Sequence, residues 1–287
     1  MVGRAPRHTP VRIDTHQHFW IYNQRDYTWM SDKMDRLRRD YLPAGLAPLL
    51  AAVGITGTIA VQARQSLEET AWLLQLADQN PFIRGVVGWV ELCSPWVDEQ
   101  LENFSQHPRL VGVRHIVHDE PDDRFMARDD FLRGLGRLKK FGLTYDLLLF
   151  PRHLSLACEV VRQFPDQPFV LDHIAKPFIR THEVEPWASD LRRLAQFENV
   201  CCKLSGMVTE ADWRGWQQPD FRPYLDIVLE SFGTRRLMAG SDWPVCTLAG
   251  SYETVISLTA DYLAQLSPSE QDHIWHSNAE KFYRLQA

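Results

Sequence analysis

The chain has 287 residues, of which 45% are hydrophobic, which is enough for one large buried core. Its formal net charge is −6 and both signs are scattered along the sequence, so no nucleic-acid partner is expected. No run approaches the roughly 18 apolar residues needed to cross a bilayer, and we expect a cytoplasmic protein without a membrane partner. The five cysteines lack CxxC spacing and are expected to be reduced.

Eight apolar or β-branched runs alternate along the chain with longer amphipathic segments. The expected strands are residues 11–19, 54–63, 83–91, 110–117, 143–150, 168–175, 200–206 and 236–244. Such alternation is typical of βα units, and a parallel sheet of eight strands tends to close. We therefore predict one α/β domain over residues 1–287, a single (β/α)8 TIM-like barrel with residues 1–10 as an N-terminal extension.

The segments between these runs have the spacing of helices. The expected helices are residues 43–52, 67–79, 95–104, 129–141, 153–164, 185–197, 221–232, 252–266 and 267–285. The clearest begins after Ser66, with Glu69 three residues later as a capping box. Residues 20–42 and 207–219 are long and irregular, and because each follows a strand, both should lie over the C-terminal face of a barrel.

Polar side chains end three of the expected strands. His16 and His18 end the first, separated by one residue, so the two-residue period of a strand directs both to one side. An HxH pair alone is weak evidence. The sixth apolar run breaks into Asp172 and His173, and the eighth ends at Asp242. Because buried polar groups are unfavourable unless paired, and because these strand ends share one rim, we predict a reaction centre there.

The sequence also resembles a known family. The motifs are Asp14-Thr-His-Gln-His-Phe-Trp, Gly112-Val-Arg-His, Leu171-Asp-His-Ile-Ala-Lys-Pro, Lys203-Leu-Ser-Gly and Gly240-Ser-Asp-Trp-Pro. Together, over residues 11–285, they resemble the lactonase branch of the amidohydrolase superfamily. That branch includes hydrolases of L-fucono- and L-rhamnonolactone and of pyrone dicarboxylate lactones. The resemblance implies a small-molecule sugar lactone as substrate, hydrolysed to its sugar acid.

The same resemblance bears on metal content. Binuclear members of the superfamily use a carboxylated lysine on strand four and a histidine on strand five, but here these strands read Val111-Gly-Val-Arg-His and Thr144-Tyr-Asp-Leu. A two-metal site is therefore not expected. His16, His18, His173 and Asp242 could hold one zinc ion. Because some members of the branch work without a divalent cation, we favour a site with no required metal, and one zinc ion is the alternative.

The four residues suggest roles in opening a lactone. Asp242 would activate water as a base, with its basicity raised by desolvation. His16 and His18 would hold the water or polarise the carbonyl, and His173 would stabilise the oxyanion or return a proton to the leaving oxygen. The alternatives are a mononuclear zinc-dependent decarboxylase, another carboxylic ester or lactone hydrolase, or a barrel that binds a ligand without catalysis.

Substrate contacts are expected from other strand ends and from the loops. The candidates are Gln62, Trp89, Arg114, His115, Lys203, Trp20 and Trp29. Arg114 could bind a carbonyl, carboxylate or polyol, or could form a structural ion pair. Trp20 and Trp29 could offer apolar faces to a sugar ring, or could pack in a loop core. Strand alternation means that only one of each adjacent pair faces inward.

Overall fold

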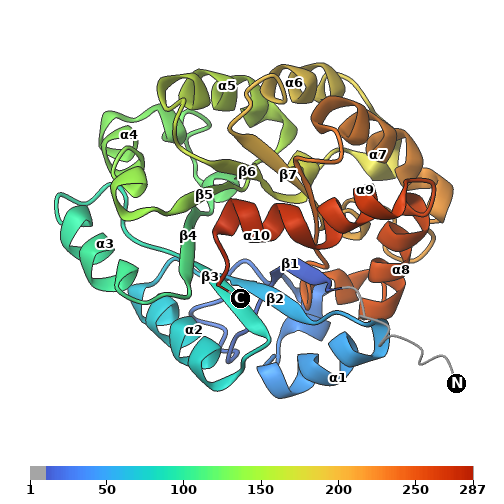
Figure 1. Cartoon of the computed structure of the whole chain (residues 1–287), viewed down its shortest axis with the longest axis horizontal. Coiled ribbons are helices and arrows are strands. Elements are labelled where there is room, and N and C mark those ends of the chain that lie inside the picture. Colours follow the sequence, from blue (N-terminus) through green and yellow to red (C-terminus); the bar gives the residue numbers. More distant parts are fainter. Residues whose placement is uncertain (1–10, 287) are drawn as a thin grey trace, which may run out of the picture.

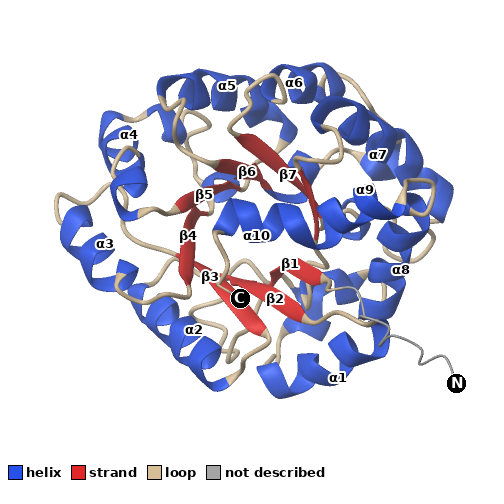
Figure 2. Cartoon of the chain, in the orientation of Figure 1, coloured by secondary structure: helices blue, strands red, loops and turns tan. Residues whose placement is uncertain are grey.

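Eight parallel strands form the centre of the molecule, in the order in which they occur along the chain (Figure 2). The computed structural model describes residues 11–286, so the predicted extension at 1–10 lies outside the described residues. The strands are β1 (Ile13–Gln17), β2 (Gly57–Val61), β3 (Ile83–Gly88), β4 (Leu110–His115), β5 (Thr144–Leu147), β6 (Phe169–Leu171), β7 (Val200–Leu204) and β8 (Leu237–Ala239). Each lies within one of the predicted runs.

The sheet closes on itself between its first and last strands. Gln17 forms a parallel bridge with Trp243, just beyond β8. The backbone N–H of Asp242 donates to the carbonyl oxygen of His16 at 2.8 Å, and that of His18 donates to the carbonyl of Trp243 at 2.7 Å. These bonds join the two strand ends that carry the predicted site. The predicted (β/α)8 fold is confirmed.

Helices surround the barrel, one after each strand (Figure 1). They are α1 (Pro43–Val53), α2 (Leu67–Gln79), α3 (Val97–Ser105), α4 (Asp129–Leu135), α5 (Leu154–Gln163), α6 (Trp187–Leu194), α7 (Gln218–Phe232) and α8 (Tyr252–Leu263). Helix α2 has the predicted bounds, and the Ser66 hydroxyl accepts the N–H of Glu69. The helix predicted at 129–141 is instead α4 followed by a 3₁₀ turn, Leu138–Phe141. Gly134 and Gly136, near the end of α4, have low helix propensity and weaken the helix at this point.

The C-terminal segment covers the N-terminal end of the barrel. We predicted one helix at 267–285, but the chain forms α9 (Pro268–Asp272), a π-helical turn and α10 (Asn278–Tyr283). Figure 1 shows α10, in red, crossing the barrel end. Its Asn278 amide donates to the carbonyl of Leu237 at 2.7 Å, and Tyr283 packs inside the barrel with Ile13 and Val170. This end is therefore filled by side chains, which leaves the opposite end for a ligand.

Two further sequence expectations concern the whole described chain. Within residues 11–286, no helix is both long and apolar enough to cross a membrane. All five cysteines lie in this range and are free thiols, as predicted.

Candidate active site

A pocket of about 370 Å³ opens at the C-terminal ends of the strands. Both long irregular segments contribute to it, as their position after β1 and β7 predicted. Its polar lining includes His18, Arg114, His118, Asp119, His173, Lys176, Glu210 and Asp242, and its apolar lining includes Trp29, Met34, Leu148, Phe150, Trp213, Val245 and Leu248. This volume suits a small molecule.

The first strand delivers His16 and His18 through an irregularity in its pairing. The register between β1 and β2 shifts between Asp14 and Gln17. Strict alternation would place Asp14 on the same side of the strand as the two histidines. Because of this shift, Asp14 faces the other side. Its carboxylate accepts the hydroxyls of Ser241 at 2.6 Å and of Tyr252, on α8, at 3.0 Å. Asp14 therefore anchors the segment that carries Asp242 from outside the barrel.

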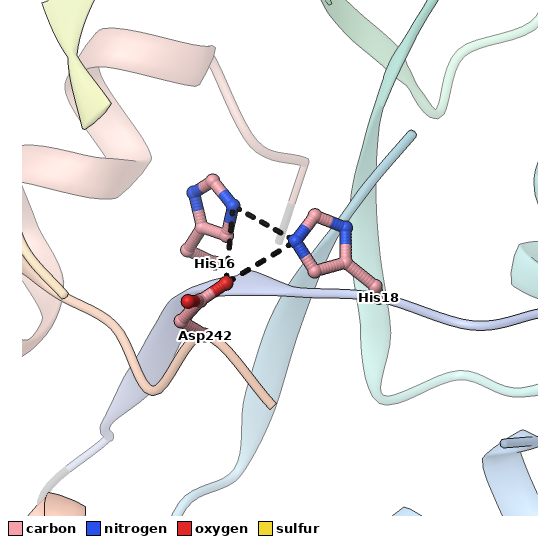
Figure 3. Close-up of side chains that lie close together, drawn as sticks. All are labelled: His16, His18 and Asp242. Carbon is pink, nitrogen blue, oxygen red and sulfur yellow. Dashed lines mark hydrogen bonds and ion pairs between the residues drawn. The ribbon is translucent and has the colours of Figure 1, made fainter. Parts of the chain in front are cut away.

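The four predicted catalytic residues come together at the base of the pocket. Asp242 Oδ1 lies 3.3 Å from His18 Nε2, 3.8 Å from His173 Nε2 and 3.9 Å from His16 Nε2. The two Nε2 atoms of His16 and His18 are 3.2 Å apart (Figure 3). All four side chains are almost fully buried. A carboxylate surrounded by three imidazoles is an arrangement suited to proton transfer.

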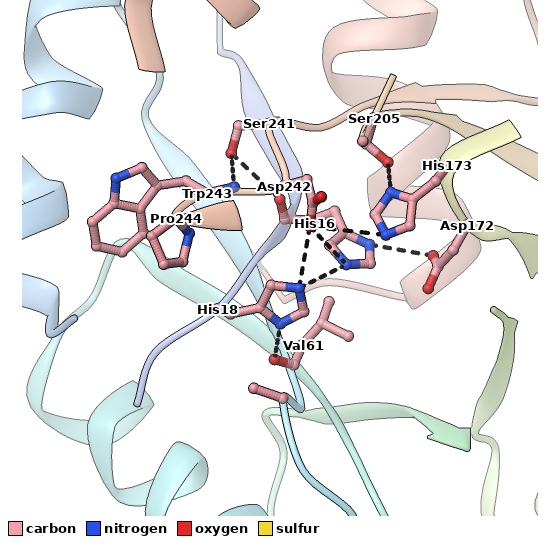
Figure 4. Close-up of polar contacts among 12 residues, drawn as sticks. His16, His18, Val61, Asp172, His173, Ser205, Ser241, Asp242, Trp243 and Pro244 are labelled. Carbon is pink, nitrogen blue, oxygen red and sulfur yellow. Dashed lines mark hydrogen bonds and ion pairs between the residues drawn. The ribbon is translucent and has the colours of Figure 1, made fainter. Parts of the chain in front are cut away.

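Unfavourable backbone conformations hold two of these residues in place. His173, Ile174, Ala175 and Lys176 all have positive φ values, from 48° to 61°, and Asp242 has φ of 59°. Residues other than glycine rarely adopt backbone angles in this left-handed region, and the resulting strain is concentrated at functional sites. The turn after β6 brings both His173 and Lys176 to the pocket, and the Ser205 hydroxyl lies 2.9 Å from His173 Nδ1 (Figure 4).

We expect Gly206→Ala to lower kcat by about tenfold or more, because a β-carbon at Gly206 would collide with the ring of His173. The matched control is Gly233→Ala, since Gly233 has nearly the same positive φ, 63° against 62°, but open space around it. Steady-state kinetics of the two variants separate displacement of His173 from backbone strain. Equal losses of kcat in both would contradict the positioning role of Gly206.

A network of buried charges lies beneath the reaction centre. Arg114 Nη1 is 3.0 Å from Asp172 Oδ2 and 3.2 Å from His16 Nε2. Lys203 Nζ is 2.5 Å from Asp146 Oδ2, 3.0 Å from Asp172 Oδ1 and 3.2 Å from His16 Nδ1. Two cations therefore bracket the ring of His16, each compensated by a buried carboxylate. Charges this deep are tolerated only when paired in this way.

The protonation states follow from burial and these neighbours. Burial lowers the pKa of His16 and of His173 well below the usual value, which favours neutral rings. For Asp242, burial acts to raise the pKa, but the adjacent His173 and His18 outweigh it and the pKa is lowered. This corrects our expectation of raised basicity. Asp242 is an ionised carboxylate at neutral pH, ready to accept a proton.

Two of the predicted substrate contacts line the pocket, namely Arg114 and Trp29. The guanidinium Nε of Arg114 and the indole Nε1 of Trp29 are buried, with no hydrogen-bond partner among the described residues. Buried donors without partners are unfavourable, and each nitrogen is covered by neighbouring atoms, so neither is itself exposed to the pocket in this conformation. Trp213 joins Trp29 in the pocket wall, whereas Trp243 packs against Tyr41. Trp29 and Trp213 are therefore placed to contact a ligand, whereas Trp243 packs among other loop side chains.

The other predicted contacts do not line the pocket. Trp20 is fully buried and donates to the carbonyl of Arg39 at 2.9 Å. His115 Nε2 lies 2.6 Å from Glu120, and Trp89 donates to its Nδ1 at 3.3 Å, because alternation along β4 turns Arg114 inward and His115 outward. Gln62 accepts from Arg114, and Lys203 lies in the buried network. Gln62 therefore reaches the four predicted residues only through Arg114, whereas Lys203 contacts His16 from below the pocket.

Several pocket residues were not predicted. His118 and Asp119 follow β4, with His118 Nδ1 2.7 Å from Asp119 Oδ1, and Phe150 follows β5. Glu210 lies in the irregular segment after β7. In the sequence, these residues could have been identified only by their position, since each follows a strand by a few residues on the face where the pocket lies.

The cluster also fits one metal ion. His18 Nδ1 donates to the carbonyl of Val61 at 2.7 Å, so in the neutral ring Nε2 carries the lone pair, and it faces Asp242 and His16 Nε2. Zinc ligands around a tetrahedral centre lie roughly 3.3–3.6 Å apart, and these three atoms are 3.2–3.9 Å apart. A second possible cluster contains Asp172, but Lys203 and Arg114 already compensate that carboxylate.

Comparison with known proteins places this geometry in a family. The amidohydrolase family model matches residues 13–285. The chain is 42% identical to an L-fucono-1,5-lactonase of Burkholderia multivorans and 35% identical to one of Burkholderia ambifaria, in each case over 96% of both chains. A crystal structure of an amidohydrolase from Burkholderia multivorans with bound zinc superposes with a TM-score of 0.91, at 42% identity, over 96% of this chain and all of that one. The chain belongs to the amidohydrolase family.

Proposed function

We propose that this protein hydrolyses a sugar lactone to its sugar acid, with L-fucono-1,5-lactone as the first substrate to test. The protein is a hydrolase of the amidohydrolase family, and its lactonase relatives align over nearly their whole length. The observation that supports the proposal best is the ionised Asp242 among three imidazoles at the base of a pocket of about 370 Å³.

In the proposed mechanism, Asp242 takes a proton from a water molecule that attacks the lactone carbonyl carbon. His18, fixed by its bond to the Val61 carbonyl, orients that water. The oxygen of the carbonyl gains negative charge as the new C–O bond forms. Arg114, a cation whose side chain lines the pocket, is assigned to stabilise that charge.

Ring opening then needs a proton on the departing oxygen. His173 Nε2 lies 3.8 Å from Asp242 Oδ1, which is beyond direct hydrogen-bond distance, so we assign His173 to relay the proton that Asp242 received through one water molecule. The bond between carbonyl carbon and ring oxygen breaks, and the relayed proton gives a hydroxyl on the sugar acid. In these reaction steps His16, which is held between Arg114 and Lys203, serves as a positioning residue for His18 and Asp242.

If zinc binds, His16, His18 and Asp242 would hold it, with His173 nearby. Such an ion would supply Lewis acidity toward a carbonyl oxygen or a water molecule. We propose that turnover does not require it, because Asp242 is already ionised and Arg114 already offers a cationic donor beside the cluster.

We expect rapid turnover of L-fucono-1,5-lactone in a panel of aldonolactones, measured by proton release with a pH indicator. The panel is run with and without a tight chelator, with zinc content measured in parallel. Loss of activity to the chelator and its recovery with zinc would contradict the metal-independent mechanism. Release of carbon dioxide from an aromatic acid, with no lactone turned over, would support a decarboxylase instead.

A further inference from the structure

An ion pair in the pocket wall has no place in the mechanism above. Lys176 Nζ lies 3.0 Å from Glu210 Oε1, and both side chains line the pocket. Lys176 follows β6 and Glu210 lies on a 3₁₀ turn, Val208–Glu210, after β7, so two separate loops supply the pair. The two side chains are only 16% and 22% exposed. Partial burial of this kind strengthens the attraction between them.

The pair leaves the pocket without an uncompensated cation among its described lining residues. Arg114 is 3.0 Å from Asp172, and Lys176 is held by Glu210. Burial would lower the pKa of Lys176, but attraction to Glu210 and Asp242 raises it, so the ammonium stays charged. Two cations therefore face three lining carboxylates, Asp119, Glu210 and Asp242.

We propose that Glu210 is a specificity-determining residue, which neutralises Lys176 so that the pocket selects uncharged lactones and rejects lactones that carry a carboxylate. The inference rests on the proposed lactonase function. A substrate carboxylate could bind Lys176 only by displacing Glu210 or by lying beside it, and like charges repel strongly in a partly buried site.

The same pair bears on release of the product. Hydrolysis converts a neutral lactone into a sugar acid, which is an anion at neutral pH. An ammonium free of Glu210 would hold that anion in a charge-assisted bond. With the ammonium engaged, the excess of carboxylates in the pocket favours departure of the acid.

The test uses lactones with the same ring and hydroxyl configuration that differ only in the group formed by the last carbon. L-Fuconolactone carries a methyl group, L-galactonolactone a hydroxymethyl group and galactarolactone a carboxylate. In Glu210→Gln, which keeps the shape and removes the charge, we expect the ratio of kcat/KM for the carboxylate over the neutral lactones to rise at least about tenfold. The sugar acid should also become a stronger inhibitor.

Two further variants isolate the ion pair. Asp119→Asn removes one negative charge from the same pocket but leaves Lys176 and Glu210 paired, so the substrate ratio should rise much less than in Glu210→Gln. Adding Lys176→Met to Glu210→Gln should abolish the gain. An unchanged ratio in Glu210→Gln, or an equal gain in Asp119→Asn, would overturn the proposal while lactone turnover stands. A wild type that hydrolyses no lactone would overturn the proposed function itself, and this inference with it.

Discussion

Replacing Asp242 by asparagine is expected to lower kcat for lactone hydrolysis by about a thousandfold, with little change in the thermal unfolding midpoint. Asparagine has nearly the same shape but cannot accept a proton from water, and general-base catalysis typically contributes about 10²–10⁴-fold. The other carboxylate beside these imidazoles, Asp172, is already paired with Arg114 and Lys203, so we do not expect it to replace Asp242. Steady-state kinetics and thermal unfolding of the variant measure both quantities.

Asp119→Asn is the control for this variant. Asp119 also lines the pocket, but its carboxylate is bonded to His118 rather than to the reaction centre. We expect its effect on kcat to be far smaller than that of Asp242→Asn. A Asp242→Asn protein that keeps near-normal kcat would disprove the role of Asp242 as the base.

Replacing Lys203 by methionine should lower the free energy of unfolding by about 3–5 kcal/mol, the usual penalty for removing one partner of a buried ion pair. Lys203 and both of its carboxylate partners, Asp146 and Asp172, are completely buried. Loss of the ammonium leaves Asp146 without a cation and Asp172 with Arg114 alone, and it releases the ring of His16. Urea unfolding measures the stability change, and we expect kcat to fall as well.

Lys139→Met provides a matched comparison. Its ammonium lies 2.7 Å from Asp166, but the two side chains are 59% and 73% exposed. Water screens such a pair, so the same substitution should cost less than about 1 kcal/mol. Similar losses at positions 139 and 203 would show that the buried network does not stabilise the fold.

The location of the candidate site was predictable because it depends on a simple property of the chain. In a parallel barrel every strand ends at the same rim, so His16, His18, His173 and Asp242 had to meet once the eight runs were identified. The spacing of histidine and aspartate at strand ends was therefore sufficient. Helix α2 was equally clear, since its cap and its periodicity are both local.

The depth at which each inward-facing side chain lies within the barrel was not predictable from the sequence. Lys203 and Gln62 end their strands much as Arg114 does, yet only Arg114 lines the pocket. The difference depends on partners from other strands, such as Asp146 on β5, which bind Lys203 below the pocket floor. Likewise, Asp14 faces away from His16, although it precedes His16 by two residues, because the pairing of β1 with β2 is irregular, and such a shift is a property of two strands together.

The sequence by itself thus determined the barrel, the rim at which the candidate site lies and the four residues that meet there, since these follow from local patterns and from the parallel arrangement of strands. Only the tertiary structure decided the charge state of Asp242, the burial of Lys203 and the pairing of Lys176 with Glu210. Each of these depends on distances between residues far apart in the chain, and electrostatic energies change steeply with distance and burial.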